Sequence, residues 1–405
     1  MTSAQQTSGP HDGRSDDRSD TNVLSLPSVS TSALTQDYLD QVDRALRDAI
    51  ERLVHTWRVD LATPLGPDGP PAPPADILLD HDLPEMLQAL NGTGGKRIRP
   101  SMAYWGWVAC GGRRPGSGAP EATDDGGAAD VVRAGAALEL LHIFALIHDD
   151  VMDESDSRRG QPSVHTLAAQ LHLHAGARGD ARHFGESIAV LVGDLAHAEA
   201  DHLVTELPRP MREIWRLLVI ELVHGQSRDL TGSAAGRRDL DHARRVARMK
   251  SGRYTVQRPL ELGAAAAGAS AEVRDALLDY GEEVGEAFAL RDDLLGVWGD
   301  PRSTGKPAGD DLISGKPTVI MALADERLHG SARRVLRRVG TPELSPADVT
   351  LLQSALAEQG VVEAVEARIS AHVRAAETAL ARVELDPAGL AGLSGMAHLI
   401  AWRDR

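Results

Sequence analysis

Apolar residues return every three or four positions along most of this chain, a spacing typical of helices and not of strands. Between residues 34 and 59, for example, leucine, valine and isoleucine fall on one side of a single predicted helix. The same spacing predicts further helices at about 83–90, 101–110, 129–153, 187–206, 211–230, 240–267 (with room for a break) and 271–297, and several more up to about residue 401.

Stretches rich in Gly, Pro and polar residues separate these helices. Residues 1–33 contain much Ser, Asp, Thr and Gly with little to bury, so we expect disorder there. Residues 34–405 are then predicted to form one all-α domain, a bundle of a dozen or so helices around a central cavity. Loops are expected at about 64–74, 111–128, 175–182 and 298–315.

Composition and charge narrow the functional classes. A net charge of −16 argues against nucleic acid or an anionic membrane surface as the main partner. Cys110 is the only cysteine, so an internal disulfide is excluded and a reducing cytoplasm is the simplest location. No apolar run is expected to reach the roughly 18 residues that span a bilayer, so we expect no stable membrane insertion.

The most informative stretch runs from residue 139 to residue 160. Its first half is aliphatic, and its second half contains five carboxylates and two arginines. On a helix, His142, Asp149 and Asp153 share one face, and carboxylates placed four residues apart repel each other unless a cation is bound. Hard oxygen ligands favour Mg²⁺. A solvated acidic helix end is the alternative for this cluster alone.

A second apolar helix ends in the same way, with Asp292 and Asp293. Two such helices facing each other would hold metal ions that coordinate a diphosphate, with the hydrocarbon tail of the substrate below. Forked guanidinium groups and ammonium groups would hold the remaining phosphate oxygens, although any one basic group could be a surface patch. The basic groups are Lys96/Arg97/Arg99, Arg158/Arg159, Lys250 and Lys306/Lys316.

Taken together, these motifs resemble the trans-isoprenyl diphosphate synthases, the polyprenyl synthetase family, over about residues 34–405. The motifs stand in family order. They are residues 95–100 (GKRIRP), 148–160 (HDDVMDESDSRRG), 225–230 (GQSRDL), 250–251 (KS) and 292–301 (DDLLGVWGDP), followed by Gly305 and Lys306.

The resemblance implies a prenyltransferase that condenses isopentenyl diphosphate with an allylic diphosphate, and a homodimer. It assigns magnesium, with three ions per active site, to Asp149, Asp153 and Asp292, supported by Asp150, Asp293 and Asp310. It assigns the isopentenyl diphosphate group to Lys96, Arg99, His142 and Arg159, and the allylic diphosphate to Arg158, Lys250, Lys306 and Lys316. The wider substrate-binding set adds Gln226, Asp229, Ser251 and Phe144, and the catalytic set is Asp149, Asp150, Asp153, Arg158, Lys250, Asp292 and Lys306.

Two positions depart from the family pattern. Gly296 stands where many relatives have a third aspartate, and we expect this to matter little, so that Gly296→Asp is tolerated. Ala289 stands where a glutamine often precedes the aspartates, which predicts weaker dipolar support for the reacting cation.

Product length is expected to depend on the residues just before Asp149. Phe144 is a lone aromatic followed by Ala145, which resembles the twenty-carbon enzymes and predicts geranylgeranyl diphosphate, with farnesyl diphosphate as the alternative. Phe144 could instead be core packing, with the floor of the tunnel made by a neighbouring helix. Two other functions are alternatives: a class I terpene cyclase, whose usual second metal motif differs from Asp292-Asp293, and a non-catalytic subunit, which should have lost its metal ligands.

The shared face of Asp149 and Asp153 gives a first prediction. Asp149→Ala or Asp153→Ala should remove most turnover while leaving the helical circular dichroism nearly unchanged, because the change affects cation binding and not the helix. Mg²⁺-dependent turnover retained in both variants would exclude the two residues from the metal site.

Overall fold

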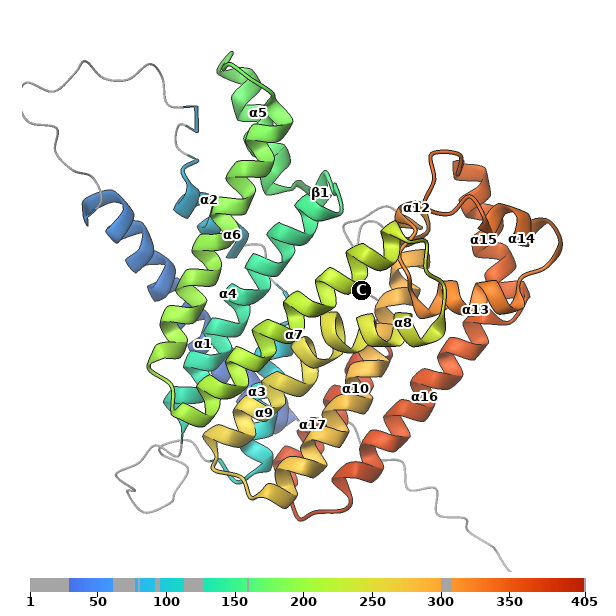
Figure 1. The fold of residues 1–405 in the computed structure, drawn as a ribbon. Helices are drawn as coiled ribbons and strands as arrows, with labels where there is room; N and C mark the ends of the chain where they lie inside the picture. The colour runs from blue at the N-terminus through green and yellow to red at the C-terminus, as the bar shows by residue number, and fades with distance from the viewer. Residues whose placement is uncertain are drawn as a thin grey trace, which may run out of the picture.

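The computed structural model describes residues 29–60, 77–78, 81–91, 95–112, 127–158, 160–299 and 308–403, which form an almost entirely helical bundle (Figure 1). Its first half comprises α1 (Val29–His55), η1 (Thr56–Asp60), α2 (Leu83–Asn91), α3 (Ile98–Ala109), α4 (Ala128–Met152), β1 (Ser157–Arg158), β2 (Gln161–Pro162), α5 (Val164–His174), α6 (Ala181–Thr205) and α7 (Arg209–Ala234). Its second half comprises α8 (Leu240–Val246), η2 (Ala247–Gln257), α9 (Arg258–Ala266), α10 (Ala271–Trp298), α12 (Asp310–Ser314), α13 (Val319–Arg327), α14 (Gly330–Leu336), α15 (Pro346–Glu358), α16 (Val361–Leu380) and α17 (Pro387–Ala401).

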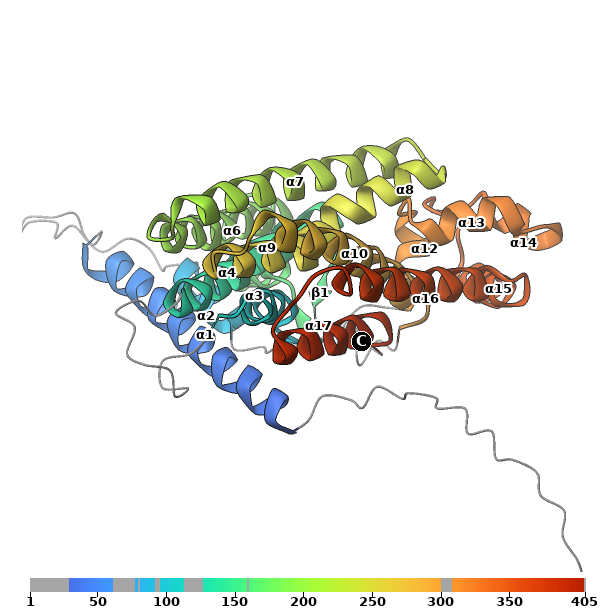
Figure 2. The ribbon, with the colours of Figure 1, turned by 90° about the horizontal axis from the view of Figure 1, so that it is seen from below.

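Helix α4 lies at the centre of the bundle. It packs against α6, α3 and α1, and Figure 2 shows α7 along one side of the bundle and α1 along the opposite side. Leu138, Leu140 and Leu141 are completely buried, as the aliphatic run of this helix requires. The apolar half of α4 therefore anchors its acidic end.

Helix α4 is also long and apolar enough, by length and composition, to cross a bilayer, so the expectation that no segment reaches that length was wrong. In the apolar stretch of 18 residues on which this rests, 61% is buried inside the protein. Its apolar character is accounted for by packing in the core.

The predicted helices are found, but some begin or end at other residues and one is interrupted along its length. Helix α1 begins at Val29, inside the segment 1–33 for which we expected disorder. The helix predicted at 240–267 is divided into α8, η2 and α9, and the central piece η2 is a π-helix of 11 residues. Helix α5 and the hairpin of β1 and β2 were not predicted, and the expectation of a loop over 298–315 was wrong at Asp310–Ser314, which forms α12. The expected loop at 64–74 lies outside the described residues, as does most of 111–128.

Two glycines let the helices that carry functional groups approach closely. A Cβ atom on Gly225 of α7 would lie 2.5 Å from the backbone nitrogen of Lys250 in η2. A Cβ on Gly252 of η2 would lie 3.0 Å from the backbone of Gly285 in α10. The π-helix η2 is thereby held between α7 and α10, which fixes the position of Lys250.

We predict that Gly225→Ala destabilises the protein by about 1–3 kcal/mol, because the new methyl group would overlap the backbone of η2. Chemical denaturation measures the change. Ser227→Ala, at an exposed position two residues further along α7, is the matched control and should stay within about 0.5 kcal/mol of the wild type. Equal stability of all three proteins would contradict the close approach.

Candidate active site

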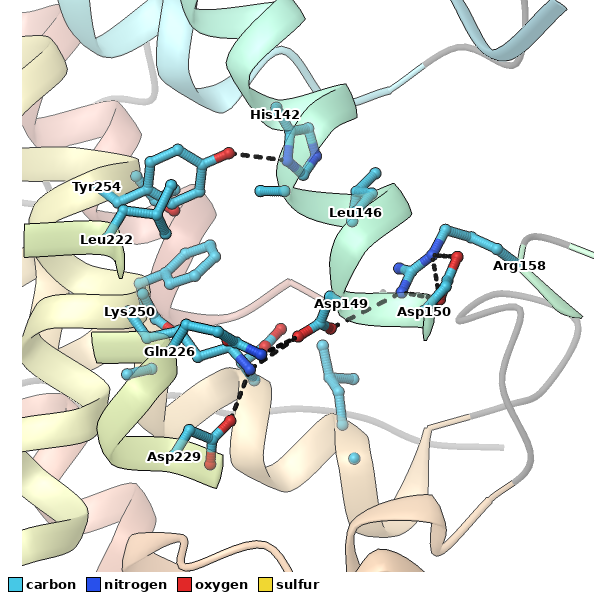
Figure 3. A pocket seen from close by; sticks show the side chains of 18 of the residues that line it. His142, Leu146, Asp149, Asp150, Arg158, Leu222, Gln226, Asp229, Lys250 and Tyr254 are labelled. Atoms are coloured by element: carbon cyan, nitrogen blue, oxygen red, sulfur yellow. Dashed lines mark hydrogen bonds and ion pairs between the residues drawn. The ribbon is translucent and has the colours of Figure 1, made fainter. Parts of the chain in front are cut away.

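A cavity of about 860 Å³ opens among α3, α4, α7, η2, α10 and α12. One side of it is apolar, with Ala145 and Leu146 from α4, Leu222 from α7, and Phe288 and Ala289 from α10. Carboxylates and basic side chains line the rest, and Figure 3 shows how those of α4, α7 and η2 converge. The predicted join of an apolar helix and an acidic end therefore lies at the wall of this cavity.

Asp149 is held by groups from two other helices. The Lys250 ammonium lies 2.9 Å from Asp149 Oδ1 and 2.6 Å from Asp229 Oδ2. Gln226 Nε2 donates to Asp149 Oδ1 at 3.2 Å (Figure 3). Burial alone would lower the pKa of Lys250, but the charges of Asp149 and Asp229 raise it above its ordinary value. The lysine is therefore a fixed positive charge between two carboxylates.

Asp150 faces the hairpin that follows α4. Its carboxylate is 4% exposed and accepts hydrogen bonds from Arg158 Nε at 2.8 Å and Arg158 Nη2 at 2.6 Å. Arg158 pairs with Gln161 in the antiparallel hairpin of β1 and β2, whose turn includes Gly160 with a φ of 74°. The forked contact orients the guanidinium group, whose Nη2 also lies 3.9 Å from Asp149 Oδ2.

The last residue of the first acidic cluster, Asp153, pairs with a lysine from after α12. Lys316 Nζ lies 2.8 Å from Asp153 Oδ2, so the ammonium group is the direct counter-charge of this carboxylate. Lys316 lines the cavity, whereas Asp153 is not among the lining residues.

The second acidic cluster lies on the cavity wall contributed by α10. Asp292 accepts a hydrogen bond from Arg403 Nη2 at 3.0 Å, and its side chain is 62% exposed. Asp293 is partly buried and accepts a hydrogen bond from the backbone nitrogen of Val319 at 3.0 Å. Burial, followed by the charges of Asp311 and Asp292, raises the pKa of Asp293 well above its ordinary value. Carboxylates are thus crowded at this edge of the cavity.

The carboxylate oxygens fit a hard divalent cation better than a soft one. Within the described part of the chain, however, no three His, Cys, Asp or Glu side chains are already gathered as a ligand set. Lysine and arginine side chains are instead the direct partners of Asp149, Asp150, Asp153 and Asp292. A divalent cation would take over charge compensation that these residues now provide.

A second polar region of the cavity surrounds His142 of α4. His142 Nδ1 lies 3.1 Å from the hydroxyl oxygen of Tyr254 (Figure 3). The guanidinium carbon of Arg99 is 4.1 Å from the centre of the Tyr254 ring, and Arg99 Nη2 donates to Thr255 Oγ1 at 3.0 Å. Lys96 also lines the cavity. Lys96 and Arg99 thus add cationic donors to the cavity lining that includes His142 and Tyr254.

The structure brings most of the predicted site residues to one cavity. The lining residues include Lys96, Arg99, His142, Asp149, Asp150, Arg158, Gln226, Asp229, Lys250, Ser251, Asp292, Asp293, Asp310 and Lys316. Arg159 and Lys306 lie outside the described residues. Arg97, which the sequence groups with Lys96 and Arg99, forms ion pairs with Asp43 and Glu139.

Phe144 is placed differently from the expectation of a tunnel floor. It is not among the cavity-lining residues, and its ring stacks on His197 of α6 with ring centres 4.7 Å apart. Its neighbour Ala145 does line the cavity. The alternative of core packing, noted from the sequence, describes this ring in the structure.

The expectation that Gly296→Asp is tolerated also conflicts with the structure. A Cβ atom at residue 296 would lie 1.9 Å from Asp311 Oδ2. A larger residue there needs Asp311 to move, because this separation is far below any van der Waals contact.

The lining residues that sequence reasoning missed include Tyr254, Asp311 and Arg403. Tyr254 lies a turn after Lys250, a proximity that periodicity could have indicated. Arg403 follows the last helix and is 8% exposed, with its guanidinium 4.1 Å from the centre of the Phe288 ring. Nothing in the local sequence around Arg403 indicates that contact.

The sequence model described as "Polyprenyl synthetase" matches residues 80–356, which is well over half of the chain. The chain belongs to this family. Similar proteins of known function in this family are prenyl diphosphate synthases. This protein is therefore a trans-prenyltransferase with the isoprenoid synthase fold.

Individual relatives agree on the reaction class and differ in product. Geranylfarnesyl diphosphate synthase of Aeropyrum pernix is 29% identical over 76% of this chain and 93% of that protein. (2E,6E)-Farnesyl diphosphate synthase of Mycobacterium tuberculosis is 30% identical over 79% of this chain and 82% of that protein. The solved geranylgeranyl pyrophosphate synthase of Corynebacterium glutamicum, complexed with isoprenyl diphosphate and magnesium, is 34% identical with a TM-score of 0.77, over 90% of this chain and 98% of that chain.

In this polyprenyl synthetase, Lys250→Met should lower the unfolding free energy by about 2 kcal/mol at pH 7. Removing one partner of a fully buried ion pair costs roughly 3–5 kcal/mol, and the loss here is smaller because Lys250 and Asp149 are partly exposed. The substitution leaves Asp149 and Asp229 without their shared counter-charge. Because the pKa of Lys250 is raised on folding, the lysine's contribution is fully present below the unfolded value of about 10.4 and is lost as pH rises through the folded value.

Urea denaturation without ligands measures this loss, with Arg212→Met at an exposed position of α7 as the control. Arg212→Met should change the unfolding free energy by no more than about 0.5 kcal/mol. Similar losses in both variants would mean that the paired carboxylates do not depend on Lys250.

Proposed function

We propose that this enzyme is a Mg²⁺-dependent geranylgeranyl diphosphate synthase that adds isopentenyl diphosphate to allylic diphosphates. The observation that carries the proposal is a single cavity whose mouth is lined by Asp149 of α4 and Asp292 of α10 and whose wall is apolar. Two separate sets of cationic side chains border it, which suits a reaction with two diphosphate substrates.

The residues divide the work between the two substrates. Asp149, Asp153 and Asp292 would hold magnesium ions, which neutralise the allylic diphosphate as a leaving group; the expected number is three. Arg158, Lys250 and Lys316 add positive charge on the same side, and Lys306 is proposed to join them. Carboxylates already hold Arg158, Lys250 and Lys316 in place, and the metal ions would take over part of that charge compensation.

The second diphosphate is proposed to bind Lys96, Arg99 and His142, with Arg159 joining them. Tyr254 supports this set by contacting both His142 and Arg99. Isopentenyl diphosphate bound there would present its double bond to the allylic carbon that loses diphosphate, and the departing diphosphate would accept the proton. No protein nucleophile is needed.

The apolar wall protects the reacting cation. Leu146, Leu222 and Phe288 exclude water, which would otherwise quench an allylic cation. Ala289, 3% exposed, offers no dipole where many relatives have glutamine, so we expect the rate and not the reaction class to differ.

A homodimer is part of the proposal. Large apolar side chains are exposed along the neighbouring helices α6 and α7, where a second copy would cover them. They are Val190 (40% exposed), Leu191 (48%), Leu217 (41%), Ile220 (47%) and Val223 (54%). We place the enzyme in the cytoplasm, in keeping with its single cysteine.

The function is tested by incubating the purified protein with Mg²⁺, labelled isopentenyl diphosphate and each allylic primer in turn. Chromatography of the dephosphorylated products should show mainly the twenty-carbon alcohol. A main product of fifteen carbons would support the farnesyl alternative, and absence of any elongated product with every primer would reject the synthase.

Product length should respond to Ala145, which lines the cavity four residues before Asp149. Ala145→Phe should shift the products toward fifteen carbons, because an aromatic ring there would shorten the space for the growing chain. Phe144→Leu, beside the cavity wall, is the matched control and should leave the product length unchanged. An unchanged spectrum in Ala145→Phe, with activity retained, would place the floor on another helix.

A further inference from the structure

The π-helix η2 carries arginines at the spacing of its own hydrogen bonds. Arg248 and Arg253 lie in η2 and Arg258 follows it directly, so the three stand five residues apart. A π-helix bonds residue i to residue i+5 and so brings such residues to one face, whereas an α-helix would turn them roughly 140° apart. The backbone nitrogen of Arg258 donates to the carbonyl oxygen of Arg253, which is a bond of the π type. The three arginines therefore form one stripe along η2.

Glutamates of two neighbouring helices pair with this arginine stripe. Glu282 of α10 lies between the first two arginines, with Oε1 at 2.7 Å from Arg248 Nη2 and Oε2 at 4.0 Å from Arg253 Nη2. Glu221 of α7 lies between the next two, with Oε1 at 2.5 Å from Arg253 Nη1 and 2.8 Å from Arg258 Nη2. Arg253 thus links α7 to α10 through η2.

The link through Arg253 is charged and partly shielded from water. The side chain of Glu221 is 9% exposed, and that of Arg253 is 23% exposed. Burial alone would raise the pKa of Glu221, but Arg258 and Arg253 outweigh burial and lower this pKa below its ordinary value. Neither Arg253 nor its two glutamate partners is among the residues that line the cavity. The link therefore supports η2 from outside the site.

The π-helical register also determines which side chains of η2 reach the cavity. Lys250 and Thr255, again five residues apart, both line it. Lys250 pairs with Asp149, and Thr255 accepts a hydrogen bond from Arg99. An α-helical register would turn Lys250 and Thr255 roughly 140° apart, so one of these contacts would be lost. Because π-helices are rare and mostly single turns, one of 11 residues needs contacts that stabilise it.

We propose that Arg253 is a positioning residue for the reaction: by linking Glu221 to Glu282 it keeps η2 in the π-helical register that presents Lys250 to a diphosphate. Arg253 acts through Lys250 and does not touch the substrate. The inference rests on the proposed function in one respect, namely that Lys250 binds a diphosphate group.

Diphosphate binding tests this role without measuring turnover. Isothermal titration of the full-length protein with inorganic diphosphate, in the presence of Mg²⁺, should show that Arg253→Met weakens binding about tenfold, as expected when a charged contact is lost. Arg245→Met, at an exposed position of α8, is the matched control and should bind as the wild type does. Wild-type affinity in Arg253→Met would overturn the proposal.

A double variant separates positioning from a general loss of stability. If Arg253 acts through Lys250, Arg253→Met should change the diphosphate affinity by less than about twofold in a protein that already carries Lys250→Met. A further tenfold loss in that background would mean that Arg253 acts independently of Lys250, and would contradict the proposal.

A milder variant keeps the test decisive if circular dichroism shows that Arg253→Met does not fold. Glu282, whose side chain is 33% exposed, is then changed to Gln, which removes the α10 end of the link. Glu282→Gln should weaken diphosphate binding at least threefold, and by less than about twofold when Lys250→Met is present. Unchanged affinity in the single variant, or equal losses in both backgrounds, would reject the proposal.

The two proposals fail in different ways. If the wild-type protein elongates no primer but binds diphosphate in a manner that depends on Arg253 through Lys250, the synthase assignment fails and the role of Arg253 stands. If it elongates primers while Arg253→Met binds diphosphate normally, the synthase stands and Arg253 is only structural.

Discussion

Charge compensation among crowded carboxylates is the constraint on which the site depends. Asp149, Asp229 and Asp293 come from three different helices, and each is shielded from water in or beside the same cavity. Lys250 and Lys316 enter between such groups from further elements. Without these ammonium groups, the like charges would repel and the ends of the helices would separate.

This constraint connects the packing of the bundle to its chemistry. Lys250 reaches Asp149 only because η2 lies against the backbone of α7 at Gly225, and against α10 at Gly252. The apolar half of α4 is buried in the core, and that burial holds the acidic end in place. The same lysines compensate carboxylates in the structure, and in the proposed reaction they would turn to the diphosphate as metal ions take over that compensation.

Much of the fold and part of the site could be predicted from sequence, because periodicity and spacing are local properties. The helix of residues 129–153 follows from the spacing alone and is found as α4, although Asp153 lies just past its end and, unlike Asp149, does not line the cavity. The π-helix η2 was anticipated only as a break, since its geometry depends on contacts with α7 and α10.

Contacts between distant segments were beyond such reasoning. Arg403 meets Asp292 across more than a hundred residues of sequence, and Asp311 fills the space beside Gly296 through the path of α12. The position of Phe144 was also undetermined, because the helical spacing does not say which neighbouring helix covers each face. In the structure the Phe144 ring packs against His197 of α6.

The central claim is that the carboxylates of α4 and α10 bind divalent cations together with an allylic diphosphate. A crystal structure of the protein with Mn²⁺ and a non-ionisable allylic diphosphate analogue tests it most directly, because anomalous scattering locates the metal. Mn²⁺ should lie between the diphosphate and the carboxylates of Asp149 and Asp292, with Lys250 contacting a phosphate oxygen. Diphosphate bound in this cavity without metal at either aspartate, or bound elsewhere on the protein, would contradict the account.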